Sequence, residues 1–190
     1  MSEEGRRLAA ERRAERIDSL KQRLESFIRP GSGPLVLEIG CGHGHWLVSL
    51  AESQPSGKFV GVDLISRRIR MAERKVDRRD LQNVLFLKAE ATEVLEAWPP
   101  DRPVNRLFLL HPDPWPKKRH AKNRLTGASF LDRMARVTEE GGELYFRTDD
   151  EPFFNWSAIQ IREHHLWEER ELPWPHEAGS YFRDMLGVHG

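Results

Sequence analysis

The stretch LVLEIGCGHG, residues 35–44, decides the fold of this 190-residue chain. Leu35 to Ile39 form a short apolar run that indicates a buried strand, and the glycines that follow at every second position indicate a tight turn. A helix is expected to start at His45, directly after that turn. Because glycine has no Cβ, such a turn lets the backbone approach a bound nucleoside closely. The stretch therefore predicts an α/β domain with a nucleoside site at its first turn.

Further apolar runs alternate with helical patterns along the rest of the chain. Strands are expected at residues 58–62, 84–87, 106–110 and 143–147. The helix after the second strand shows an apolar stripe at helical spacing: Ile65, Ile69, Ala72 and Val76. Later helices are expected from about Thr92, Ser129 and Pro152. This alternation predicts a Rossmann-like α/β fold with a mainly parallel, doubly wound sheet and helices on both faces.

The two ends of the chain differ from this regular middle. A helix is expected over residues 6–28, with an apolar stripe of Ile17, Leu20, Leu24 and Phe27, and the break at residues 30–34 ends it. We therefore predict a helical extension over residues 1–33 and one domain over residues 34–190. Residues 168–171 are expected to form an edge strand, and the sequence leaves open whether the final strand of the sheet is missing or is supplied by a partner chain.

Composition excludes several classes of protein. The formal net charge is zero, and the single cysteine, Cys41, cannot form a disulfide within the chain. No apolar run approaches the roughly 20 residues of a membrane helix, so we expect a cytoplasmic protein without a membrane partner. One local excess of charge stands out, because KKRHAKNR at residues 117–124 carries five cationic side chains. The seven Arg and Lys residues at positions 67–79 are interpreted as a solvated helix face.

The acidic residues around the glycines favour S-adenosylmethionine over NAD. The pattern is E-x-G-x-G-x-G, with Glu38 ahead of Gly40, and Asp63 follows Gly40 by 23 positions at the end of the second strand. Asp63 can accept hydrogen bonds from ribose hydroxyls, and Glu38 suits the positively charged amino-acid end of the cofactor. An acid at position 38 would repel a pyrophosphate. Glu90, after the third strand, is placed to face the adenine amine.

The loop after the fourth strand is the other candidate for chemistry. It reads HPDPWPKKRH at residues 111–120, and its prolines stiffen it by fixing φ. Because ligands bind at the carboxyl ends of parallel strands, Asp113 should lie near the transferable methyl group. His111 is expected to have a packing role. Trp115 could stack on a base or pack the loop, and the sequence leaves both open.

These motifs make the chain resemble the tRNA (guanine-N7-)-methyltransferase family over about residues 34–190. The resemblance implies transfer of a methyl group from S-adenosylmethionine to N7 of guanine 46 in the tRNA variable loop. It implies a catalytic role for Asp113, and it implies a cofactor site made of Glu38, Gly40, Gly42, Gly44, Asp63, Glu90 and Asp113. The residues that it implies for tRNA binding are Lys117, Arg119, His120, Lys122, Arg124, Asp149 and Ser180.

Two positions depart from the family pattern. Glu90 stands where the family often has Asp, which conserves an acceptor. Near the C-terminus the family carries T-x-x-E, and this chain has Ser180 and Arg183 in the best register. Arg183 cannot accept hydrogen bonds from a guanine edge as Glu does.

Two alternatives stay open at this point. The chain could be a non-catalytic cofactor-binding and tRNA-binding subunit that lost turnover through its C-terminal changes, or an NAD-dependent oxidoreductase. No metal site is expected, since the eight histidines are scattered and the pairs His43/His45 and His164/His165 lack a Cys or carboxylate at metal-ligand spacing. The sequence does not decide between a monomer and a homodimer.

Overall fold

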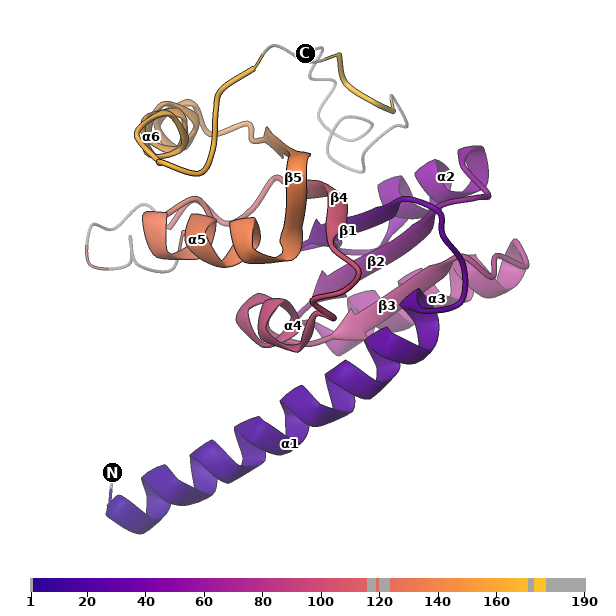
Figure 1. Ribbon diagram of the computed structural model, residues 1–190, viewed down its shortest axis with the longest axis horizontal. Coiled ribbons are helices and arrows are strands. Elements are labelled where there is room, and N and C mark those ends of the chain that lie inside the picture. Colours follow the sequence, from indigo (N-terminus) through magenta and orange to yellow (C-terminus); the bar gives the residue numbers. More distant parts are fainter. Residues whose placement is uncertain (1, 116–118, 120–123, 171–172, 177–190) are drawn as a thin grey trace.

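The computed structural model describes residues 2–115, 119, 124–170 and 173–176. Within these residues the strands form one sheet of order β3-β2-β1-β4-β5 (Figure 1), and every neighbouring pair is parallel. Their bounds are β1 Leu35–Ile39, β2 Lys58–Asp63, β3 Val84–Lys88, β4 Val104–Leu110 and β5 Thr138–Arg147. The predicted parallel sheet is confirmed, and the carboxyl ends of its strands lie at one edge.

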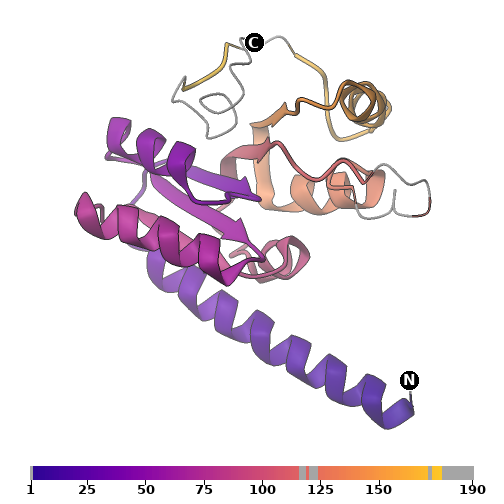
Figure 2. The ribbon, with the colours of Figure 1, turned by 180° about the vertical axis from the view of Figure 1, so that it is seen from behind.

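Helices cover both faces of the sheet, as the two opposite views show (Figures 1 and 2). Their bounds are α1 Glu3–Ile28, α2 His45–Ser53, α3 Ser66–Arg78, α4 Ala91–Ala97, α5 Ala128–Val137 and α6 Glu151–Arg162. Buried residues of α1, α4 and α5 share one apolar cluster, and those of α2 and α3 share the other. The predicted doubly wound arrangement is therefore confirmed.

Strand β1 runs through the centre of the sheet and is buried on both sides. Leu35, Leu37 and Ile39 belong to the cluster with α1 and α4, whereas Val36 belongs to the cluster with α2 and α3. Because side chains alternate along a strand, Glu38 lies on the same side as Val36. Its neighbours in register are Gly61 on β2 and Phe108 on β4. The central strand thus carries a carboxylate into the apolar interior.

The sequence reasoning was wrong in three places. Strand β5 begins at Thr138 rather than at residue 143, because the pairing with β4 continues across an irregularity that contains Gly141, whose φ is 76°. Ile65, predicted to be buried, is 45% exposed just before α3 begins. Residues 168–170 form no strand, while the last residue of that predicted edge, Glu171, lies outside the described residues.

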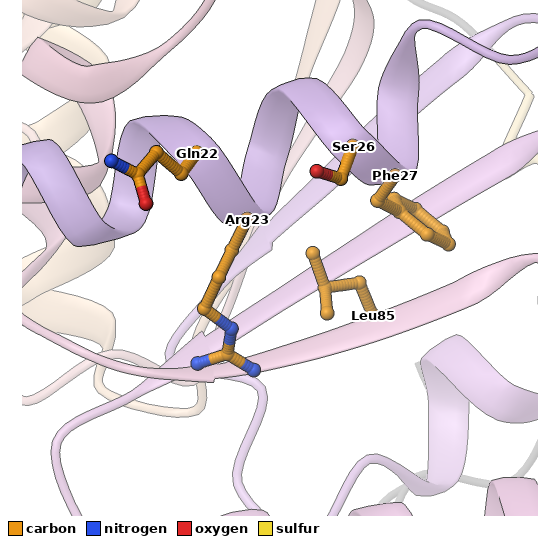
Figure 3. A pocket seen from close by; sticks show the side chains of 5 residues that line it. All are labelled: Gln22, Arg23, Ser26, Phe27 and Leu85. Atoms are coloured by element: carbon orange, nitrogen blue, oxygen red, sulfur yellow. The ribbon is translucent and has the colours of Figure 1, made fainter.

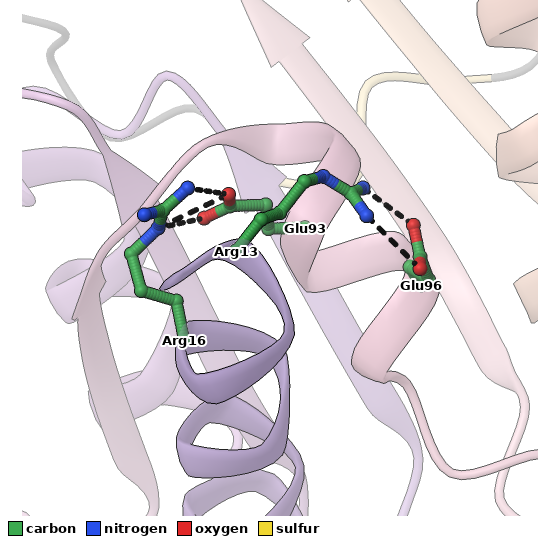
Figure 4. Close-up of polar contacts among 4 residues, drawn as sticks. All are labelled: Arg13, Arg16, Glu93 and Glu96. Atoms are coloured by element: carbon green, nitrogen blue, oxygen red, sulfur yellow. Dashed lines mark hydrogen bonds and ion pairs between the residues drawn. The ribbon is translucent and has the colours of Figure 1, made fainter. Parts of the chain in front are cut away.

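Helix α1 is joined to the sheet domain by its second half and by ion pairs from its first half. Leu20, Leu24 and Ile28 are buried in the core. Nearer its start, Arg13 pairs with Glu96 at 2.5 Å, and Arg16 pairs with the buried Glu93 at 2.6 Å, both on α4 (Figure 4). None of the helices in the described part of the chain is long and apolar enough to cross a bilayer.

Gly44, the last glycine of the first turn, is packed too closely for a side chain. Its φ is 66°, and a Cβ there would lie 2.5 Å from Phe86 Cζ and 2.8 Å from Ala72 Cβ. We expect Gly44→Ala to lower the free energy of unfolding by about 2–4 kcal/mol, since overpacking adds to the left-handed backbone cost. Urea unfolding measures this change in free energy, and the Gly42→Ala variant is the control.

Gly42 also has a positive φ, of 55°, but a Cβ there meets nothing within 4 Å. Gly42→Ala should therefore lower the free energy of unfolding only by the cost of the left-handed backbone, about 1 kcal/mol. Equal losses in the two variants would contradict the close packing at Gly44.

Candidate cofactor and substrate site

The turn between β1 and α2 is held open at the carboxyl edge of the sheet. Gly40, Gly42 and Gly44 all have positive φ. The amides of Gly40 and Cys41 both donate to the carbonyl of Val62, at 2.8 and 3.0 Å, which ties the turn to the end of β2. A Cβ at Gly40 or at Gly42 would meet nothing within 4 Å. The backbone at these two positions is therefore free to approach a ligand.

Asp63, the last residue of β2, organises the same turn. Its side chain is buried, and Oδ2 accepts from the amide of Gly42 at 3.1 Å, while Oδ1 accepts from the amide of Ile65 at 2.8 Å. Arg68 on α3 pairs with Oδ2 at 3.3 Å. A carboxylate has about four acceptor positions, so these three contacts leave room for about one further donor, such as a ribose hydroxyl.

Glu38 lies beside Asp63 in the interior. It is 3% exposed, and its Oε2 has no hydrogen-bond partner in the described part of the chain. Burial, and then the nearby charge of Asp63, raise the pKa of Glu38 to about 8. A buried carboxyl oxygen without a partner is costly unless a donor or a cation satisfies it. The site therefore fits a ligand that brings a positive charge to Glu38.

Glu90 is the residue before α4 and is exposed. It occupies the N-cap position, but its side chain makes no capping hydrogen bond to the helix. The ion pairs between α1 and α4 hold the helix that follows it. Glu90 thus presents an exposed carboxylate from the start of a helix that is fixed in place.

The loop after β4 carries Asp113 on an unusual backbone. His111 and Trp115 have φ values of 49° and 44°, in the left-handed region that is costly for residues other than glycine. The amide of His111 donates to the carbonyl of Arg147 at 2.7 Å, and its ring lies 3.4 Å from Asp149 Oδ1. Asp113 is exposed. The ends of β4 and β5 thus place the start of the loop that carries Asp113 next to Asp149.

The predicted tRNA-binding residues are only partly within the structure. Arg119 is exposed. Arg124 is half-buried, and it is committed to contacts within the protein. Four of the predicted residues lie outside the described residues: Lys117, His120, Lys122 and Ser180.

Two cations that support the site were not identified from the sequence. Lys75 donates to the carbonyl of His43, within the glycine turn, at 2.7 Å, and Arg68 pairs with Asp63. Both belong to the run at residues 67–79 that was interpreted as a solvated face. The sequence did contain a signal for these two roles. Arg68 and Lys75 are seven positions apart, which places both cations on the side of α3 that faces the glycine turn.

A cluster of Asp132, His164 and His165 is the one group of possible metal ligands found among the described residues. His164 Nε2 lies 3.2 Å from Asp132 Oδ1, and its Nδ1 accepts from the amide of Leu166 at 3.3 Å. Both ring nitrogens of this buried histidine are therefore used within the protein. Sequence spacing missed the carboxylate because Asp132 comes from α5.

A groove also lies between α1 and β3 (Figure 3). Its lining residues are Gln22, Arg23, Ser26, Phe27 and Leu85. None of them is a predicted site residue.

Known proteins resemble this chain in sequence. A family model described as "Putative methyltransferase" matches residues 32–180. Proteins named tRNA (guanine-N(7)-)-methyltransferase are similar in sequence. The one from Rhizobium meliloti (strain 1021) is 36% identical over 73% of this chain and 60% of its own length. The one from Bacillus subtilis (strain 168) is 35% identical over 70% of this chain and 62% of its own length. The chain thus spans about three-fifths of the length of these relatives.

Solved structures share the fold. A precorrin-6y C5,15-methyltransferase from Geobacter metallireducens GS-15 superposes with a TM-score of 0.57 at 14% identity, covering 76% of this chain and 69% of that one. TrmN from Thermus thermophilus superposes with a TM-score of 0.54 at 20% identity, covering 72% of this chain and 40% of that one. The predicted Rossmann-like methyltransferase fold is therefore confirmed.

Proposed function

The chain belongs to the methyltransferase family whose model matches residues 32–180, and we propose that it methylates N7 of guanine 46 in the tRNA variable loop. The observation that carries this proposal is the buried Oε2 of Glu38, which has no hydrogen-bond partner among the described residues, next to Asp63 at an open glycine turn. An acidic pair of this kind fits a cationic nucleoside such as S-adenosylmethionine. The names of the sequence relatives support guanine N7 of tRNA as the acceptor.

Each acidic residue has a separate part in holding the cofactor. Glu38 binds its ammonium group, Asp63 accepts from a ribose hydroxyl, and Glu90 accepts from its adenine amine. Gly40 and Gly42 leave room for it to lie against the backbone. When bound, S-adenosylmethionine supplies an electrophilic methyl group on a positively charged sulfur. NADH has no cation to offer Glu38, so calorimetry should detect binding of S-adenosylhomocysteine and none of NADH.

The acceptor atom needs little help from the protein. Guanine N7 carries an in-plane lone pair and no proton, so no base has to act before it attacks the methyl group. The protein contributes mainly alignment and exclusion of water. Asp113 accepts a hydrogen bond from N1–H or the exocyclic amine of the guanine, and its charge favours the cation that develops on the purine.

The basic residues at positions 117–122 bind the tRNA backbone, where cations set position without reading sequence. Exposure of Arg119 supports this part of the proposal. Because phosphate contacts release counterions, tRNA affinity should fall steeply with salt, and Arg119→Ala should reduce the slope of log K against log salt by about one.

The methylated atom is tested by product analysis. Unmodified tRNA is incubated with the protein and cofactor and then digested to nucleosides. Mass spectrometry against standards should find 7-methylguanosine as the product. Methylation at any other guanine atom would reject the N7 assignment while leaving the cofactor assignment intact.

The raised pKa of Glu38 predicts a pH dependence of cofactor binding. Below pH 8 the free protein holds a proton on Glu38, whose pKa is raised to about 8. A bound ammonium favours the ionised carboxylate, so binding releases this proton. We therefore expect the affinity for S-adenosylhomocysteine to rise between about pH 5.5 and 7.5, by up to about tenfold per pH unit.

Calorimetry in buffers of different ionisation enthalpy also measures directly the number of protons that are released when the cofactor binds. Glu38→Gln should bind more weakly and with no such slope. A wild-type affinity that is flat across this range would contradict the role of Glu38.

A further inference from the structure

The guanidinium of Arg124 joins the Asp113 loop to helix α6. Its Nε donates to the carbonyl of Pro114 at 2.9 Å, and its Nη2 donates to the carbonyl of Trp115 at 3.2 Å. The same group lies 4.5 Å from the ring centroid of Trp156 and 5.6 Å from that of Phe153, both on α6. One side chain thus holds the two residues that directly follow Asp113.

The loop requires such support because of its backbone. A bulky residue with positive φ persists only where the surroundings hold it, and Trp115 has a φ of 44°. Its carbonyl is one of the two that Arg124 binds. At the other end of the loop, the amide of His111 donates a hydrogen bond to the carbonyl of Arg147. The loop is thus fixed on both sides of Asp113.

A second contact fixes the segment that carries Arg124. Thr126 and Ser157, on α6, share a buried hydrogen bond of 2.7 Å between their hydroxyls. Helix α6 begins directly after Asp150, whose side chain accepts from the amide of Phe153 at 2.8 Å. The predicted tRNA contact Asp149 immediately precedes that cap. Arg124 therefore sits between the Asp113 loop and the element that starts beside Asp149.

The chemistry of these contacts is specific to arginine. A planar guanidinium can donate to two neighbouring carbonyls and still stack on an aromatic face. A lysine ammonium keeps the charge but is a compact point donor without a planar face. The contacts therefore use the shape of the side chain more than its charge.

We propose that Arg124 is a positioning residue that holds Asp113 for methyl transfer and is not a contact to the tRNA backbone. This inference rests on the proposed function, since it assigns to Arg124 a part in the same reaction. A displacement of about 1 Å in an aligned site can cost about a hundredfold in rate. Loss of Arg124 should therefore lower kcat and leave tRNA affinity unchanged.

Three variants test the proposal from both sides of the contact. Arg124→Lys keeps the charge and loses the planar fork, Trp156→Leu keeps Arg124 and removes its stacking face, and Trp156→Phe restores an aromatic face. We expect Arg124→Lys and Trp156→Leu to lower kcat by about ten- to a hundredfold, with unchanged tRNA Kd and salt slope. Trp156→Phe should keep most of the wild-type activity. Arg119→Ala serves as the phosphate-contact reference.

The double variant Arg124→Lys/Trp156→Leu should be no slower than the slower single variant, because both changes break one contact. Multiplicative losses would overturn the proposal. A normal kcat in Arg124→Lys would also overturn the proposal. The same holds if Arg124→Ala loses tRNA affinity and salt slope as Arg119→Ala does.

Hydrogen exchange in the free protein gives a readout that needs no activity. The loop amides of Asp113 and Trp115 should exchange faster in Arg124→Lys and in Trp156→Leu than in the wild type. Unchanged exchange would overturn the proposal. If the wild type transfers no methyl group, the proposed function fails, and this measurement still decides whether Arg124 holds the loop.

Discussion

Asp113→Ala is expected to lower kcat for tRNA methylation by about 10²- to 10³-fold, the loss typical of removing one group that stabilises developing charge. Asp113 is exposed and stands on a loop fixed at both ends, so its side chain is available to a substrate. No other contact of the fold depends on it in the described residues. Thermal stability should therefore stay close to the wild-type value.

Asp113→Asn separates the two roles of this side chain. Its amide oxygen can still accept a hydrogen bond from the guanine edge, but it brings no negative charge to the forming cation. We expect a kcat between those of the wild type and Asp113→Ala. Asp101→Ala, which removes an exposed aspartate paired with Arg29, is the control and should leave kcat unchanged. Near-normal turnover in Asp113→Ala would remove both roles.

Asp63→Ala is expected to weaken binding of S-adenosylhomocysteine by about 10- to 10²-fold. A hydrogen bond to a charged group contributes about 1.5–3 kcal/mol, and the variant loses the one that Asp63 accepts from the ribose. It also leaves the amides of Gly42 and Ile65 without their acceptor. We therefore expect a second effect, a loss of about 1–3 kcal/mol in the free energy of unfolding.

The matched control is Asp77→Ala, an exposed aspartate on α3. It should change neither cofactor affinity nor unfolding. Calorimetry and urea unfolding measure the two effects separately. An Asp63→Ala protein that binds the cofactor normally would show that Asp63 serves the turn alone.

The regular part of the fold could be predicted from local sequence signals. β1 was predicted with its observed bounds, because an apolar run followed by closely spaced glycines has few other interpretations. The early start of β5 was missed, since the glycines at positions 141 and 142 usually end a strand, and only pairing with β4 shows that the strand continues past them. Local patterns do not contain that pairing.

The position of an acidic residue could be predicted where a strand fixes it. Glu38 lies near the end of β1, Asp63 is the last residue of β2 and Asp113 follows β4, so the parallel topology places all three at the carboxyl edge of the sheet. The tasks of the cations were not predictable in this way. Arg68, Lys75 and Arg124 lie in sequence runs typical of solvated or RNA-binding surfaces, and tertiary contacts direct each of them at backbone or carboxylate oxygens.

The most direct test of the account is methyl transfer from labelled S-adenosylmethionine to two unmodified tRNA transcripts that differ only at variable-loop position 46. With guanine at that position, the protein should transfer label, and digestion should place it in 7-methylguanosine. With adenine there, no label should appear. Equal labelling of both transcripts, or no labelling of either by a protein that binds the cofactor, would contradict the account.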